Sequence, residues 1–209
     1  MTKIAYINAR LIDPASGLDE TGALLTDENL IVDFGPRLAA DILPEDVMTI
    51  DCKGMCLTPG LVDMRAQLGE PGFEHKETIS SGSQSAAAGG ITSLACLPNT
   101  DPPIDSVALV GFIERRAREA AMVNIYPYAA ITQGMRGDEI TEMGLLSAAG
   151  AIAFTDGLKA VGNPKVMSRA LSYAKSFDLL LVQHPEDPTL AEGGVMNSGE
   201  ISTRLGLGG

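Results

Sequence analysis

The sequence predicts an α/β protein in which a short β-rich segment precedes part of a parallel (β/α)8 barrel. The first 55 residues contain apolar runs without a strong helical period, and turn residues separate these runs. From residue 56 onward, strand-like and helix-like segments alternate, which is typical of parallel strands joined by crossover helices. We therefore assign residues 1–55 to an N-terminal β-rich (sandwich) domain segment and residues 56–209 to the first five or so β/α units of a truncated barrel.

In the β-rich segment, three apolar runs predict strands at residues 3–12, 23–35 and 47–57. An Asp-Pro and a Gly-Pro dipeptide follow the first two runs and predict turns there. The spacing of apolar residues is that of a sheet rather than of a helix.

The barrel segment contains five predicted strands with helices between them. The strands are expected at residues 57–64, 91–97, 124–131, 151–156 and 179–184, and the helices at 77–90, 108–122, 139–150 and 164–177. A closed barrel of this type needs eight units, and five strands leave a sheet edge open. We therefore expect the sequence to be the first part of a longer protein.

Charge and hydropathy exclude two classes of target. The chain has 15 basic and 27 acidic residues, a formal net charge of −12, whereas nucleic-acid binding depends on Lys and Arg that neutralise phosphates. No apolar run approaches the roughly 18 residues of a membrane span, and the N-terminus lacks the apolar core of a secretory signal. We expect a cytoplasmic protein that binds neither nucleic acid nor membrane.

The three cysteines, Cys52, Cys56 and Cys96, do not form a recognisable metal site. Cys52 and Cys56 have a spacing that zinc sites use, but no second Cys or His pair completes a ligand set. We expect all three to be buried as small apolar side chains rather than to act as ligands or to form disulfides.

The barrel segment resembles a known family of enzymes. The sequence PGLVDMRAQLGEPG, residues 59–72, is similar to the first-strand motif of dihydroorotases and of related hydantoinases and allantoinases. Residues 70–105, EPGFEHKETISSGSQSAAAGGITSLACLPNTDPPID, resemble dihydroorotase almost throughout, and the resemblance continues in AFTDG, QHPED and NSGEISTRLGLGG. It implies an amidohydrolase-type TIM barrel, a site at the carboxyl ends of the strands, and a place in pyrimidine biosynthesis.

The family resemblance assigns a metal site to the end of the first barrel strand. Active members carry a His-x-His pair there, and the zinc that it binds lowers the pKa of water to about 7 for attack on a cyclic amide. In this sequence the two positions are Arg65 and Gln67, separated by Ala66. A guanidinium is cationic and has no acceptor lone pair, and glutamine offers only a weak amide oxygen. The resemblance therefore implies a degenerate metal site.

Two vestigial substrate-binding positions, Gly69 and Asn99, follow from the same resemblance. Active relatives have an arginine at the position of Gly69, where it clamps the carboxylate of the substrate. Glycine cannot make that contact. Asn99 is retained at a family substrate contact, although an Asn-Thr turn can equally be structural.

Asp156 and His184 are the remaining metal-site positions in view. Asp156 matches the fourth-strand aspartate of dihydroorotases, whereas hydantoinases and allantoinases use a carboxylated lysine there. His184 matches a fifth-strand ligand, although a single histidine at a strand end is often structural. Two ligands fall short of the three that a catalytic zinc keeps. We therefore expect no bound metal and no cofactor; zinc is the cofactor of the active relatives.

Two functions remain open, and a third possibility is that the fragment has no function of its own. The first is a non-catalytic dihydroorotase-like protein, a pseudoenzyme that acts as a scaffold for aspartate transcarbamoylase, the preceding enzyme of the pathway, and forms an oligomer in its full-length form. The second is an active metal-dependent cyclic amidohydrolase that hydrolyses a cyclic amide C–N bond with an altered site. Zinc analysis and a dihydroorotate assay on the full-length protein would separate the two.

A final prediction concerns what replaced the metal. If Arg65, Asp156 and His184 meet at the strand ends, the guanidinium can donate a charge-assisted hydrogen bond to the Asp156 carboxylate. Gln67 can then bond a ring nitrogen of His184. The alternative is that Arg65 extends into solvent and water fills the site.

Overall fold

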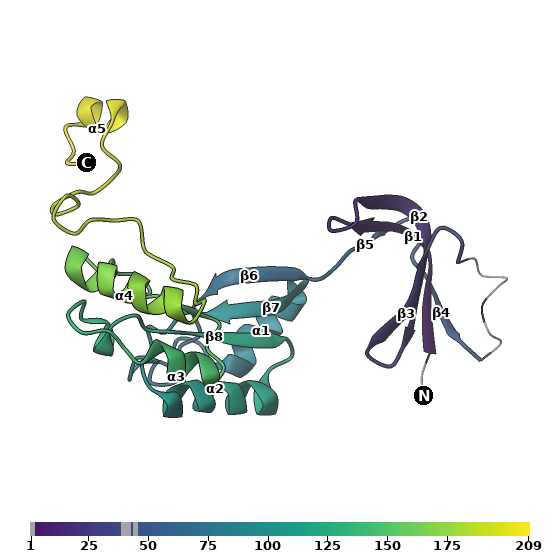
Figure 1. The fold of residues 1–209 in the computed structure, drawn as a ribbon. Coiled ribbons are helices and arrows are strands. Elements are labelled where there is room, and N and C mark those ends of the chain that lie inside the picture. Colours follow the sequence, from purple (N-terminus) through teal and green to yellow (C-terminus); the bar gives the residue numbers. More distant parts are fainter. Residues whose placement is uncertain (1–2, 39–42, 44–45) are drawn as a thin grey trace. The chain divides into compact units, whose positions relative to one another are not determined.

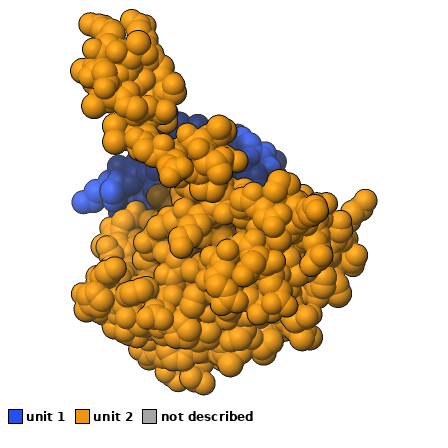
Figure 2. All heavy atoms as spheres, turned by 90° about the vertical axis from the view of Figure 1, so that its left-hand side faces the viewer, with its two compact units in different colours: residues 1–60 blue, residues 61–209 orange. Residues whose placement is uncertain are grey.

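The computed structural model describes residues 3–38, residue 43 and residues 46–209. The chain divides into two compact units, residues 1–60 (unit 1) and residues 61–209 (unit 2), which Figure 2 distinguishes by colour. In the part of the chain that the structure describes, no helix is long and apolar enough to cross a membrane.

Unit 1 contains one mixed sheet with the strand order β3-β2-β1-β4, and β5 also pairs with β1 (Figure 1). Its strands are Lys3–Asp13 (β1), Leu18–Asp27 (β2), Leu30–Gly35 (β3), Met48–Asp51 (β4) and Cys56–Leu57 (β5). β1 is antiparallel to β2 and parallel to β4 and β5. The pairing of β5 with β1 places residues 56–60, which we assigned to the barrel segment, in unit 1.

Turns divide two of the three predicted N-terminal strands. The run at 23–35 forms the hairpin β2–β3, in which Glu28 has a φ of 55° at the reversal. The run at 47–57 is interrupted at Lys53 and Gly54, which have φ values of 50° and 80°. Left-handed backbone of this kind ends a strand, and the apolar pattern of the flanking residues does not reveal it.

A small core stabilises the unit 1 sheet. Ala9, Leu11 and Cys52 are buried in it, and Leu57 packs against them. Cys56 is exposed, so the expectation that all three cysteines are buried was wrong. Successive side chains of a strand point to opposite faces, and because Leu57 points to the core, Cys56 points to solvent.

Unit 2 contains a parallel sheet whose strands lie in chain order, β6-β7-β8-β9 (Figure 1). The strands are Leu61–Ala66 (β6), Ile91–Cys96 (β7), Asn124–Ala129 (β8) and Ala153–Phe154 (β9). The helices are Ile79–Ala88 (α1), Val107–Ala120 (α2), Gln133–Met135 (η2, a 3-10 turn), Met143–Ala148 (α3), Pro164–Ser176 (α4) and Glu200–Leu205 (α5). The curled parallel sheet with its crossover helices confirms the α/β, partial-barrel fold class.

The fifth predicted strand, residues 179–184, is reduced to one isolated bridge between Leu181 and Phe154. The N–H of Phe154 donates to the carbonyl of Leu180 at 2.9 Å, and the N–H of Val182 donates to the carbonyl of Phe154 at 2.8 Å. β9 itself is only two residues long, so it offers little ladder for a longer partner.

Helices α1 and α4 begin at capping residues that the sequence supplies. The Thr78 hydroxyl accepts from the N–H of Ser81, and the Ser81 hydroxyl accepts from the N–H of Thr78, both at 3.1 Å. This capping box satisfies donors that a helix start leaves free. The Asn163 side chain caps α4, whose first residue is Pro164.

The core of unit 2 lies between the parallel sheet and its helices. Its largest buried side chains include Ile79, Val110, Ile113, Met143 and Phe154. Parallel sheets bury their faces under helices, and α2 contacts both α1 and α3. This packing holds the carboxyl ends of β6 to β9 at one edge of the sheet, where the candidate site lies.

Candidate functional site

A cavity of about 140 Å³ lies at the carboxyl ends of the unit 2 strands. Its walls come from β6, from the residue after β7, from β8, from the residues after β9 and from residues 182–185. The side chains that matter below are Arg65, Tyr128, Thr155 and His184. Segments far apart in the sequence thus converge where barrels of this class place their sites.

Arg65 lines this cavity from β6, and its side chain is exposed. Its backbone N–H donates to the Asp63 carboxylate at 2.9 Å. Among the ion pairs of the described residues, none involves the Arg65 guanidinium. A cationic residue without an ion-pair partner in the described chain therefore lines the cavity, at the position where the family resemblance implies the first metal-binding histidine.

His184 lines the same cavity from the segment that follows the isolated bridge. Its Nδ1 atom is buried and lacks a hydrogen-bond partner within the described part of the chain. Its Nε2 atom lies 3.7 Å from a carboxylate oxygen of Glu186. The predicted contact between Gln67 and a ring nitrogen of His184 is therefore absent from the described structure.

Asp156 is buried but faces away from this cavity. One carboxylate oxygen accepts from the N–H of Thr132 at 2.9 Å, and the other accepts from the Thr132 hydroxyl. Burial raises the pKa of Asp156, and the hydrogen bonds from Thr132 oppose that rise. The predicted Arg65–Asp156 bond was wrong, because Thr132 already donates to both oxygens.

Gln67 is exposed and does not contribute to the cavity wall. The ladder between β6 and β7 changes register between Asp63 and Ala66. Such an irregularity re-aims side chains along a strand, and here the neighbours Met64 and Arg65 both line the cavity. The prediction that alternate residues of this strand share one target assumed a regular strand.

Gly69 and Asn99 lie on loops beside the strand ends. A Cβ atom at Gly69 would lie 2.4 Å from the carbonyl oxygen of Phe73 and 2.7 Å from that of Glu77. The loop therefore leaves no space for a side chain at this position. Asn99 is partly buried and lies against Gly157, where an added Cβ would be 3.3 Å from the Asn99 Cβ.

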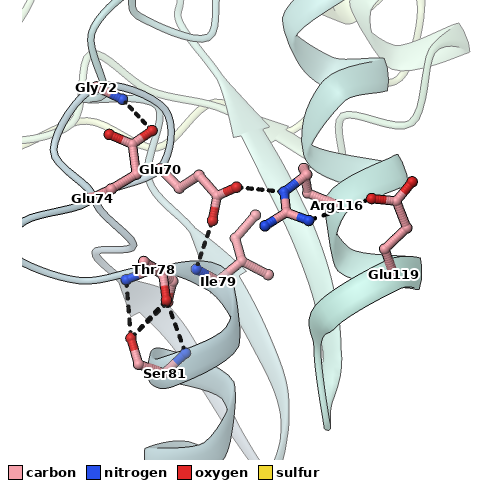
Figure 3. A network of polar contacts seen from close by, with 8 residues as sticks. All are labelled: Glu70, Gly72, Glu74, Thr78, Ile79, Ser81, Arg116 and Glu119. Carbon is pink, nitrogen blue, oxygen red and sulfur yellow. Dashed lines mark hydrogen bonds and ion pairs between the residues drawn. The ribbon is translucent and has the colours of Figure 1, made fainter.

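The loop after β6 is anchored by Glu70, a residue that the sequence indicated only as part of a flanking motif (Figure 3). Its buried carboxylate accepts from the N–H of Ile79 at 3.1 Å and from Nε of Arg116 on α2 at 2.5 Å. Arg116 also pairs with Glu119 at 3.4 Å. The contact raises the pKa of Arg116, chiefly through the hydrogen bond with Glu70. Glu70 thus ties the loop to the start of α1 and to α2.

Sequence reasoning also missed Thr132 and Tyr128, which lie at or just beyond the end of β8. Both are buried, Thr132 beneath Asp156 and Tyr128 in the cavity wall. The available signal was position alone, since polar residues at the carboxyl end of a barrel strand are site candidates.

The residues present do not fit a zinc ion. Across residues 3–38, 43 and 46–209, no three His, Cys, Asp or Glu side chains are grouped so that they could hold a metal. The cavity wall instead presents the Arg65 cation beside His184, and Asp156 faces Thr132. A cation at a metal position opposes metal binding.

Comparison with known proteins matches residues 54–209 to a family described as "Dihydro-orotase-like". The dihydroorotase of Wolbachia sp. subsp. Brugia malayi (strain TRS) is 49% identical over 208 residues, which are 99% of this chain and 46% of that protein. The dihydroorotase of Citrifermentans bemidjiense is 46% identical over 200 residues, which are 96% of this chain and 46% of that protein. The chain thus spans about half the length of the curated relatives it matches.

Solved structures show the same fold at lower sequence identity. An L-hydantoinase (dihydropyrimidinase) from Arthrobacter aurescens superposes with a TM-score of 0.77 at 21% identity, covering 92% of this chain and 42% of that chain. A dihydroorotase structure gives a TM-score of 0.55 at 13% identity, covering 90% of this chain and 52% of that chain. These likenesses support the fold assignment alone.

Proposed function

The chain belongs to the dihydroorotase-like family, and we propose that it comes from a non-catalytic member, a pseudoenzyme that serves pyrimidine biosynthesis without hydrolysing dihydroorotate. The observation that supports this most directly is that Arg65, a cationic residue, lines the strand-end cavity. A permanent cation there disfavours the zinc on which the family's chemistry depends.

The loop after β6 supports the same proposal. Active relatives need an arginine at position 69 for the substrate carboxylate, whereas Gly69 packs against the backbone carbonyls of Phe73 and Glu77. Two separate parts of the ancestral site are therefore altered, the metal position and the carboxylate clamp.

Zinc content and hydrolysis of the full-length protein test this part of the proposal. We expect substoichiometric zinc after purification and no turnover of dihydroorotate. Arg65→His combined with Gln67→His should raise the zinc content, because it removes the cation and restores the His-x-His pair of active relatives next to the His184 segment, while the surface control Arg115→His should not. Stoichiometric zinc together with turnover in the parent protein would contradict it.

We further propose that the full-length protein is a scaffold for aspartate transcarbamoylase. The support is the family resemblance, together with a chain that keeps its fold motifs while its site chemistry is altered. A stable interface should bury on the order of 1,200 Å² or more in total. Co-expression followed by size-exclusion chromatography should give one joint peak. Separate peaks at micromolar concentration, with transcarbamoylase activity unchanged, would contradict the proposal.

An active cyclic amidohydrolase is the second candidate. It is favoured by the relatives at 46% and 49% identity, which are named dihydroorotases, and by the retention of Asp156 and His184. The zinc and hydrolysis measurements above distinguish the two candidates directly.

A further inference from the structure

The cavity at the strand ends has an unbalanced positive charge. Among its lining residues Arg65 is the one with a permanent charge, and no Asp or Glu side chain contributes to the wall that the structure describes. The nearest sequence candidate, Asp156, directs both oxygens to Thr132. A guanidinium with no carboxylate partner at a concave site is the chemistry that recognises oxyanions bidentately.

Two further polar groups in the wall have hydrogen-bonding capacity to spare. The buried Nδ1 of His184 has no partner in the described structure, and an unsatisfied buried ring nitrogen is costly. The Thr155 hydroxyl accepts from the N–H of Gly157 at 3.1 Å, which leaves its own proton free to donate. Three of the lining residues, Arg65, Thr155 and His184, therefore carry potential donors.

We propose that this cavity binds a small oxyanion, a phosphate or a carboxylate group, with the Arg65 guanidinium as its principal contact. The volume of about 140 Å³ corresponds to four or five water molecules at ~30 Å³ each. A group of four or five heavy atoms fits that space.

Two acidic side chains lie close to the cavity in the chain, and neither forms an ion pair with the Arg65 guanidinium. Asp63 accepts from the backbone N–H of Arg65, and Glu186 faces the Nε2 edge of His184 from an exposed position. Glu186 therefore lies at the edge of the imidazole opposite Nδ1. The ring tautomer that carries its proton on Nδ1 can donate a hydrogen bond from that atom.

Calorimetric titration of the full-length protein with inorganic phosphate, and separately with acetate, tests the proposal at constant ionic strength. We expect saturable binding of at least one anion, weakened by roughly tenfold or more in Arg65→Gln. Arg65→Lys should bind with intermediate affinity, because it keeps the charge and loses the planar fork. Arg169→Gln, an exposed position on α4, makes the same charge change away from the cavity and should bind like the parent.

Binding of phosphate alone or of acetate alone supports the proposal and shows which shape the cavity prefers. No saturable binding of either anion, or equal binding by the parent and Arg65→Gln, overturns it. Arg65 is exposed, so the variant should keep its fold, and a thermal melt checks this. The inference goes beyond the proposed scaffold function, whose failure would be seen separately in the zinc, turnover and co-expression experiments.

Discussion

At Gly69, the space around one backbone atom decides whether the arginine that the family resemblance implies there could be accommodated. A Cβ at this position would lie within 2.4 Å and 2.7 Å of two carbonyl oxygens, both of them backbone atoms. Gly69→Ala should therefore destabilise the protein by about 1–3 kcal/mol through overpacking. Urea denaturation of the full-length protein measures the change.

The matched control for Gly69→Ala is Gly111→Ala in α2, where an added Cβ meets no atom within 4 Å. There the substitution should stabilise by about 0.5–1 kcal/mol, because glycine is a poor residue in a helix interior. A Gly69→Ala protein as stable as its parent would show that the loop relaxes easily and could accept the lost arginine.

Cys56 and Cys96 should differ in reactivity because one is exposed and the other is buried. Burial raises the pKa of the Cys96 thiol to about 12, whereas the Cys56 side chain is exposed. At pH 8 the Cys96 thiol is therefore protonated, and it reacts slowly because the thiolate is the reactive form. Iodoacetamide at pH 8 should alkylate Cys56 and spare Cys96 in the native protein, and should modify both in urea. Peptide mass spectrometry reads out each site, and native labelling of Cys96 would contradict its placement.

At the scale of elements, the Glu70–Arg116 pair joins the loop after β6 to two helices (Figure 3). Glu70→Gln removes the negative charge that pairs with Arg116. Breaking a fully buried pair costs about 3–5 kcal/mol, and because the Arg116 side chain is 33% exposed, we expect about 2 kcal/mol here. Urea denaturation with a Glu70→Gln/Arg116→Gln double-mutant cycle isolates the coupling.

Glu114→Gln provides the control for this pair, since Glu114 contacts Arg118 on the exposed surface of the same helix at 3.7 Å. Surface pairs contribute less than about 1 kcal/mol. If both glutamate variants unfolded at the same urea concentration, Glu70 would have no anchoring role.

The extent to which each element could be predicted follows from the range of the interactions that form it. The alternation of strands and helices predicted β6 to β9 and α1 to α4, because local periodicity and caps such as Thr78 and Asn163 act within a few residues. The fifth strand was predicted from an apolar run alone. Its pairing depends on β9, which presents only a two-residue edge.

At the scale of the whole molecule, exposed apolar surface predicts how residues 1–209 behave when isolated. Leu61, Val62 and Met64 on the edge strand β6 are 60%, 64% and 71% exposed, and β3 exposes Leu30 and Ile31. Exposed apolar edges favour association. The isolated residues should therefore self-associate and lack one sharp unfolding transition.

Light scattering coupled to chromatography, together with calorimetry, tests this expectation for the isolated residues. The full-length protein is the comparison, because the curated relatives are about twice as long as this chain. A monomer that melts in one cooperative step would contradict the prediction.

The sequence by itself determined the fold class, the family resemblance and the positions at which that resemblance implies an altered site. Periodicity and residue type are local properties, and Arg65 is a cation wherever its side chain points. The tertiary structure alone decided that Thr132 satisfies Asp156, that Gln67 does not line the cavity, and that backbone carbonyls close on Gly69. These outcomes depend on side-chain direction and on contacts between distant segments, which no local pattern specifies.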